Sequence, residues 1–339
     1  MNEEMTFFYN RILDVTSFGS ILTKPFCFYI LVMKTPKYMR TVSYFIINEL
    51  GWNFLGNLIY TLGHPIPMMP AACFRIDGLA SNFLQTEFQR FLYFTALATT
   101  VLNCCLGFIP TFIYRYVTLA FLDAAARVHP FWGFLCCAVL QLITSFLVAI
   151  LFFSVWLPTS EYRGELPQDT RNLFCYEEGP KLAIVMYFFY AAFGVFGLSV
   201  TVLGGLCVRE LWVKKSAMSK TTLLLQKEIV KNLLIITGSA LFFASLPFVV
   251  VVFFIYNSKL PFAWIIVSNA LLFPLNFGTV YALLIFILFK SYRKTVVDIV
   301  RSVLQAFKRA CAVCKTSQDT SSTVMPLYLV SRPHAFYTR

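Results

Sequence analysis

Seven long apolar stretches, each about the length of a membrane-spanning helix, dominate the sequence. A helix needs about 20 largely apolar residues to cross the hydrocarbon core of a bilayer. Charged residues make up only 13% of the chain, against about 25% in an average soluble domain. The stretches therefore predict seven transmembrane helices, with ends uncertain by a few residues. We place them at 14–33, 42–63, 91–113, 131–156, 182–207, 229–256 and 262–289.

The composition excludes a soluble protein. Apolar and aromatic residues make up 58% of the chain, and Phe alone occurs 37 times. A soluble fold would have to expose much of this surface to water, whereas lipid is the solvent for the outer faces of membrane helices. The fold class that we predict is an all-α membrane protein, a seven-helix bundle with a C-terminal amphipathic helix.

The net charge of +12 is confined to short segments between the apolar stretches, which argues against nucleic-acid binding. One alternating set of flanks carries 20 of the 28 Lys and Arg residues. This set consists of 34–41, 114–130, 208–228 with nearby Lys231, and the tail from Lys290. Cytoplasmic loops carry such an excess, so the distribution predicts the N-terminus outside and the C-terminus inside.

The pattern of residues at the end of the chain predicts a basic amphipathic helix followed by a polar tail. Apolar residues recur with a period of 3.6 after residue 290, and such a helix should lie at the inner membrane surface. Cys311 and Cys314 follow, either as S-palmitoylation sites or as free thiols. We expect the following division: 1–13 extracellular N-terminus, 14–289 transmembrane bundle, 290–314 membrane-surface helix and 315–339 disordered cytoplasmic tail.

Ionisable residues inside membrane helices are rare and often functional. Glu49 lies in the second span, and we expect it to face the bundle interior. It is either a conformational switch or ion site, or a neutral hydrogen-bonded acid. Lys24 interrupts the first span, and its long side chain suggests that it reaches toward the outer surface. Pro110, Pro247 and Pro274 predict kinks, with or without a role as hinges.

Cys73 and Cys175 are the only cysteines in the predicted outer loops. The outer compartment is oxidising, so we expect them to form a disulfide that ties the second outer loop over the bundle mouth. The other cysteines lie mostly in apolar stretches, and the three histidines are far apart in sequence. We therefore predict no metal site and no cofactor.

The sequence contains no nucleophile elbow, zinc helix motif or phosphate loop, so we predict that the protein is not an enzyme. A transporter is an alternative, although transporters often carry internal repeats and several midplane charges. A channel subunit is another, although we find no polar stripe that would line a pore. The odd number of spans with an external N-terminus is typical of a receptor.

Several short motifs occur in order around the predicted spans. They are Lys34-Thr35-Pro36-Lys37-Tyr38-Met39, Tyr114-Arg115-Tyr116, Leu223-Leu224-Leu225-Gln226-Lys227, Leu246-Pro247 and Ser291-Tyr292-Arg293. From about Phe18 to Arg293, the chain resembles the nematode serpentine chemoreceptors of class H, in the Str superfamily. It departs from that family where Ile113-Tyr114 replaces Glu-Asn and where Phe277-Gly278 replaces His-Gly.

The resemblance implies a G-protein-coupled chemoreceptor that detects a small external molecule and activates a heterotrimeric G protein. The aromatic, nearly charge-free set of candidate pocket residues given below suits an apolar molecule. It also implies a multi-pass protein of the plasma membrane, in the cilia of sensory neurons. Membrane lipids are further partners, and receptor dimers are possible; one alternative is a receptor that traffics or dimerises without signalling itself.

Such a receptor would bind its ligand in the outer half of the bundle. The candidate pocket residues are Trp52, Phe91, Tyr93, Phe94, Tyr187, Tyr190, Phe254, Trp264 and Asn269. The candidate switch and coupling residues are Glu49, Arg115, Tyr116, Lys227, Pro247 and Asn276.

Overall fold

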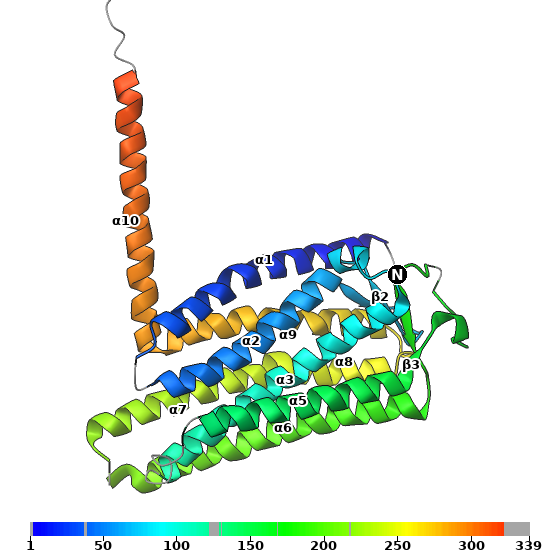
Figure 1. Ribbon diagram of the computed structural model, residues 1–339, viewed down its shortest axis with the longest axis horizontal. Coiled ribbons are helices and arrows are strands. Elements are labelled where there is room, and N and C mark those ends of the chain that lie inside the picture. The colour runs from blue at the N-terminus through cyan, green and yellow to red at the C-terminus, as the bar shows by residue number, and fades with distance from the viewer. Residues whose placement is uncertain are drawn as a thin grey trace, which may run out of the picture. The chain divides into compact units, whose positions relative to one another are not determined.

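The computed structural model describes residues 3–36, 39–121, 129, 131–167, 169–216 and 218–321. The chain divides into two units, Met1–Arg293 and Lys294–Arg339, and each is described by itself. The first unit is a bundle of long helices that run side by side, with a small β sheet at one end (Figure 1).

Seven helical spans make up the bundle in the described part of the chain. They are α1 (Glu3–Met33), α2 (Arg40–Gly63), α3 (Glu87–Ala120), α5 (Phe131–Val155), α6 (Pro180–Val213), the continuous run of α7 (Lys220–Ala240), π-helical turn η5 (Leu241–Ser245) and α8 (Leu246–Tyr256), and α9 (Ala263–Leu288). Six of these described spans are long and apolar enough to cross a membrane. The seventh, α2, is less apolar but packs against α1, α3 and α9. The predicted all-α bundle of seven spans is confirmed.

The helices extend beyond the apolar stretches that predicted them. α1 begins at Glu3, well before the expected start at residue 14, and α6 continues to Val213 rather than ending near residue 207. Their ends carry ordinary helix signals. At the start of α3, Thr86 and Gln89 form a reciprocal capping box. The side chain of Ser219 accepts from the backbone N–H of Thr222 at the start of α7.

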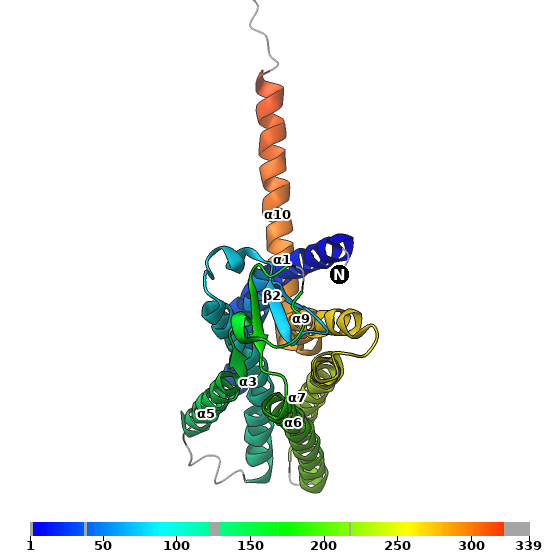
Figure 2. The same ribbon diagram turned by 90° about the vertical axis from the view of Figure 1, so that its right-hand side faces the viewer.

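Large apolar side chains cover the outside of the bundle. Phe18 of α1, Leu142 of α5 and Leu198 of α6 are each about two-thirds exposed or more. Lipid is the solvent that such faces need. Inside, α3 occupies the middle of the bundle, where it packs against α2, α5 and α6 (Figure 2).

A four-stranded antiparallel sheet lies at the end of the bundle where α1 begins (Figures 1 and 2). Its strands, in spatial order, are β1 (Pro65–Pro67), β2 (Cys73–Ile76), β4 (Leu173–Tyr176) and β3 (Trp156–Leu157). The sequence predicts only loops here, because strands of two to four residues are too short to show an alternating pattern. Cys73 lies opposite Cys175 across β2 and β4, and a disulfide joins them.

α10 (Lys290–Ser321) is the predicted C-terminal helix, and it continues beyond the expected end at residue 314. The apolar side chains of Val300, Val303, Leu304 and Phe307 are exposed. The side chains of Cys311 and Cys314 lie outside the described part of the structure, as do residues 322–339.

Candidate functional site

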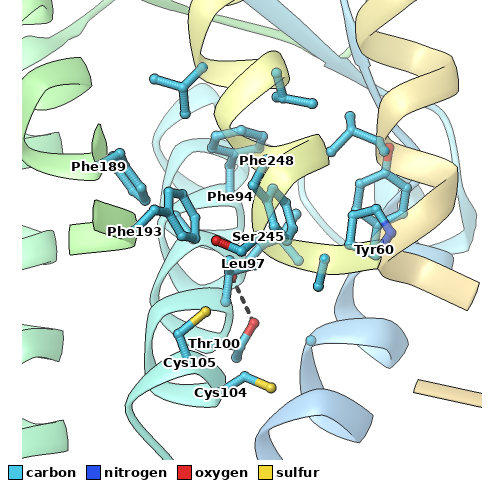
Figure 3. A pocket seen from close by; sticks show the side chains of 18 of the residues that line it. Tyr60, Phe94, Leu97, Thr100, Cys104, Cys105, Phe189, Phe193, Ser245 and Phe248 are labelled. Carbon is cyan, nitrogen blue, oxygen red and sulfur yellow. Dashed lines mark hydrogen bonds between the residues drawn. The ribbon is translucent and has the colours of Figure 1, made fainter. Parts of the chain in front are cut away.

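A cavity of about 190 Å³ lies inside the bundle, below the sheet (Figure 3). Side chains of α2, α3, α5, α6, α7, η5, α8 and α9 line it, together with residues in or next to the sheet such as Phe74 and Tyr176. None of the described residues that line it carries a charge. An apolar cavity of about 150 Å³ in another protein binds benzene, so this cavity has room for a small organic molecule.

Aromatic rings from α6 and α8 form one wall of the cavity. Phe189 and Phe193 project from α6 toward Phe248 of α8 (Figure 3). The rings of Phe193 and Phe248 stack with centroids 5.8 Å apart and planes 6° apart. On α6, Phe189, Phe193 and Phe196 have helical spacing and are all buried, so one face of the helix supplies the wall.

Two of the nine predicted pocket residues, Trp52 and Phe94, line the cavity. Two further predicted residues on α3, Phe91 and Tyr93, do not line it. Phe91 is fully buried but packs outside the lining, against Phe153 and Trp156. Tyr93 donates a hydrogen bond to the carbonyl of Ile59 on α2. Phe91 and Phe94 are three residues apart and lie on one face of α3, whereas Tyr93 points elsewhere, and the sequence did not show which of the three reaches the cavity.

The other five predicted pocket residues also lie outside the lining. Tyr187 is 64% exposed on the outer surface, and Asn269 is exposed with its amide bonded to the carbonyl of Ile265. Tyr190, Phe254 and Trp264 are partly buried without reaching the cavity. An aromatic ring near the outer end of a span is equally suited to lipid and to a pocket, so composition alone does not distinguish the two positions.

On the α2 side, polar groups connect the cavity to α9. Asn57 is buried, lines the cavity and donates to the carbonyl of Leu275 at 2.9 Å. That carbonyl directly follows Pro274, which also lines the cavity. Deeper along α3, Cys104 and Cys105 line the same space (Figure 3).

Glu49 is buried further along α2, in contact with two other helices. Its Oε1 accepts a hydrogen bond from Thr111 of α3 at 2.6 Å, and its Oε2 accepts one from Tyr281 of α9 at 2.5 Å. The side chain therefore joins α2, α3 and α9. It faces the bundle interior, where the sequence analysis expected it.

Lys24 does not reach the outer surface, so that expectation is wrong. The side chain is fully buried, and Nζ donates to the carbonyl of Asn53 at 3.4 Å. Gly278 of α9 makes this possible, because a Cβ there would collide with the side chains of Asn53 and Lys24. α2 and α9 pack against this face of α1, so the side chain has no path to the surface.

Arg115 is buried near the opposite end of α3 from the sheet. Its Nη1 lies 3.5 Å from Oε1 of Gln226 on α7, and within the described chain its Nε and Nη2 have no hydrogen-bond partner. At the same end, Nζ of Lys214 donates to the carbonyls of Leu119 and Ala120 at 2.7 and 2.6 Å. These contacts join α3 to the ends of α6 and α7.

The remaining switch candidates do not meet in one place. Tyr116 packs its ring against Phe121, and Lys227 is exposed on α7. Asn276 is exposed on α9 and accepts a hydrogen bond from Thr16 at 3.4 Å. Pro247 lies in the first turn of α8, directly after η5.

Charged and polar groups hold the outer sheet in place. Tyr162 donates to Oε1 of Glu178 at 2.5 Å and accepts from the backbone of Ala72. Hydrogen bonds from Arg171 to Asp169, together with the positive charges of Arg171 and Arg75, lower the pKa of the Asp169 carboxyl to about 2. These residues do not line the cavity, but they hold in place the sheet that covers one end of it. Among the described residues, no group of His, Cys, Asp and Glu has the arrangement of a metal site.

Comparisons with known proteins agree with this architecture. A family model described as serpentine type 7TM GPCR chemoreceptor Srh matches residues 4–302. Comparison with curated proteins finds no match.

Proposed function

The chain belongs to the serpentine seven-transmembrane chemoreceptor family, and from that premise we propose that it detects a small, mostly apolar external molecule and activates a heterotrimeric G protein. The observation that carries the proposal is the uncharged, aromatic cavity below the disulfide-bonded sheet. Such apolar pockets between helices are typical sites for small ligands.

The end with the sheet faces outward in this proposal. The basic flanks lie at the other end of the spans, as expected for a cytoplasmic face. The disulfide between Cys73 and Cys175 also requires an oxidising compartment. The protein is thus a multi-pass receptor of the plasma membrane, and we assign it to sensory cilia on the family's account.

The ligand acts by shifting an equilibrium between two arrangements of the helices. Two lining elements are suited to move. η5 and Pro247 interrupt the regular hydrogen bonding of the α7–α8 span, and Pro274 does so in α9. Asn57 and Glu49 hold α9 against α2, so a ligand that moves either span also changes the contacts of these two side chains.

At the inner face, the contacts of Arg115 and Lys214 keep the ends of α3, α6 and α7 together. Opening them would let the G protein enter between these helix ends, next to Lys227, which is already exposed on α7. α10 lies in the inner membrane interface, where the exposed apolar side chains of Val300 and Leu304 enter lipid. Acylation of Cys311 and Cys314 would strengthen that attachment.

The test is calcium imaging of cells that express the chain, against a panel of volatile molecules. We expect responses to some of them, and we expect G-protein blockade to remove those responses. Accumulation of a panel molecule in vesicles, without any G-protein response, would instead identify a transporter.

A further inference from the structure

Ser245 differs from the other hydroxyl groups that line the cavity. Thr100 donates to the carbonyl of Leu97, and Tyr60 shares a hydrogen bond with Tyr9. The hydroxyl of Tyr176 has no partner in the described chain, but it is enclosed by protein atoms. Ser245 is only 7% exposed and makes no hydrogen bond to any described residue, and its oxygen points into the cavity (Figure 3).

The geometry of η5 explains why this hydroxyl is free. A serine inside a helix usually donates to the carbonyl four residues earlier, which for Ser245 is that of Leu241. In this π-helical turn, the backbone N–H of Leu246 donates to the same carbonyl. Pro247 has no N–H with which to continue a regular helix, and the wider turn directs Ser245 inward.

The surroundings of Ser245 are apolar. Phe193, Phe248 and Leu97 lie near it in the cavity (Figure 3). A hydroxyl in such a place gains a partner only from what enters the cavity, and a buried polar group without one is unfavourable. Because no lining residue is charged, the entering group must also be uncharged.

We infer that Ser245 is a specificity-determining residue, and that the ligand is a small apolar molecule that carries one uncharged oxygen, a carbonyl or a hydroxyl, hydrogen-bonded to Ser245. This inference rests on the proposed receptor function, which it extends by naming the class of ligand. Ser245 is the last residue of the π-helical turn before Pro247. The hydrogen bond with the ligand is therefore made at the point where the regular helix of the α7–α8 span is interrupted.

The experiment compares the binding of three probes of similar size to the purified full-length chain: n-hexane, n-hexanol and methyl butyl ketone. Direct binding is measured, so the result does not depend on signalling. We expect the ketone, the alcohol or both to bind about tenfold more tightly than the alkane, because one neutral hydrogen bond contributes about that factor.

Two variants of equal size isolate the hydroxyl. Ser245→Thr keeps it, and we expect the preference for the oxygen-bearing probes to persist. Ser245→Val removes it in the same volume, and we expect all three probes to bind alike. Ser239→Ala is the matched control, because Ser239 lies on α7 away from the cavity and bonds the carbonyl of Ile235.

Equal binding of the three probes to the wild-type chain would overturn the inference, as would a preference that survives in Ser245→Val or a failure of all three probes to bind. None of these results by itself removes the receptor function, which calcium imaging tests separately. Conversely, the expected preference together with no G-protein response to any ligand would leave the Ser245 site standing and remove the receptor function.

Discussion

The hydroxyl of Tyr281 lies 2.5 Å from Oε2 of Glu49, so an acidic side chain deep in α2 is held by a donor from α9. Thr111 of α3 donates to the other oxygen of the same carboxyl group. Glu49, which lies well inside the second predicted span, therefore joins three helices.

Removing one donor from this junction should loosen α9. We expect Tyr281→Phe to lower the free energy of unfolding by about 0.6 kcal/mol, the mean for hydrogen bonds between membrane helices, and by at most about 1.7 kcal/mol, and to raise ligand-independent signalling. The measurements are thermal unfolding of the purified chain and basal G-protein activation. Tyr187→Phe is the control, because Tyr187 is exposed on the outer surface. Equal behaviour of the two variants would contradict a role for the junction.

Arg115 should require its planar guanidinium group rather than its charge alone. Arg115→Lys keeps the charge but not the fork of donors, so we expect normal surface delivery and ligand binding with weakened G-protein activation. Arg209→Lys, at an exposed position of α6, is the matched control. If Arg115→Lys matches the wild type in all three measurements, the residue has no switching role.

The disulfide between Cys73 and Cys175 should determine whether the outer sheet folds. Removing a native disulfide typically costs about 2–5 kcal/mol, so we expect Cys73→Ser and Cys175→Ser each to reduce surface delivery. The double variant should be no worse than either single one, since all three lose the same bond. Surface labelling measures delivery. Additive losses would mean that each cysteine has a separate role.

His64 should make the junction of α2 and β1 sensitive to acid. Burial lowers the pKa of its imidazole, although Asp14 and Asp77 act in the opposite direction. The unfolded chain, with a histidine pKa of about 6.5, therefore takes up a proton more readily than the folded chain. Stability should be full above that pH and should decrease as the pH falls below it.

His64→Asn tests this pH dependence. His64 has a φ of 45°, a left-handed conformation that asparagine tolerates well. We expect the variant to lose the acid sensitivity in thermal unfolding between neutral and mildly acidic pH. An unchanged pH profile would assign the sensitivity to another group.

The sequence predicted the helices because a helix that crosses lipid needs a long apolar stretch. Such a stretch can be recognised from composition alone, without knowing which side of the helix faces the bundle. The second span, expected at 42–63, is Arg40–Gly63 in the structure. The pairing of Cys73 with Cys175 followed from their compartment alone. These features depend on the solvent around each segment, which composition reveals.

The cavity could not be predicted in the same way. In this bundle both the lipid-facing and the inward-facing sides of a helix are apolar, so periodicity does not separate them. Tyr187 and Phe189 are two residues apart on α6, yet one is exposed and the other lines the cavity. The burial of Lys24 depends on Gly278, and the free hydroxyl of Ser245 depends on a π-helical turn that no short pattern in the sequence indicates.

The most direct test of the account is ligand-dependent nucleotide exchange by a heterotrimeric G protein on the purified chain in lipid. The ligand is whichever panel molecule gives the strongest cellular response. Ala98→Phe fills the cavity from α3, and Ala96→Phe adds the same ring on the exposed side of that helix. We predict that the ligand accelerates exchange with the wild-type chain and with Ala96→Phe, but not with Ala98→Phe. If the ligand does not change the exchange rate of the wild-type chain, or changes it equally in the wild-type chain and both variants, the protein is not a receptor that works through this cavity.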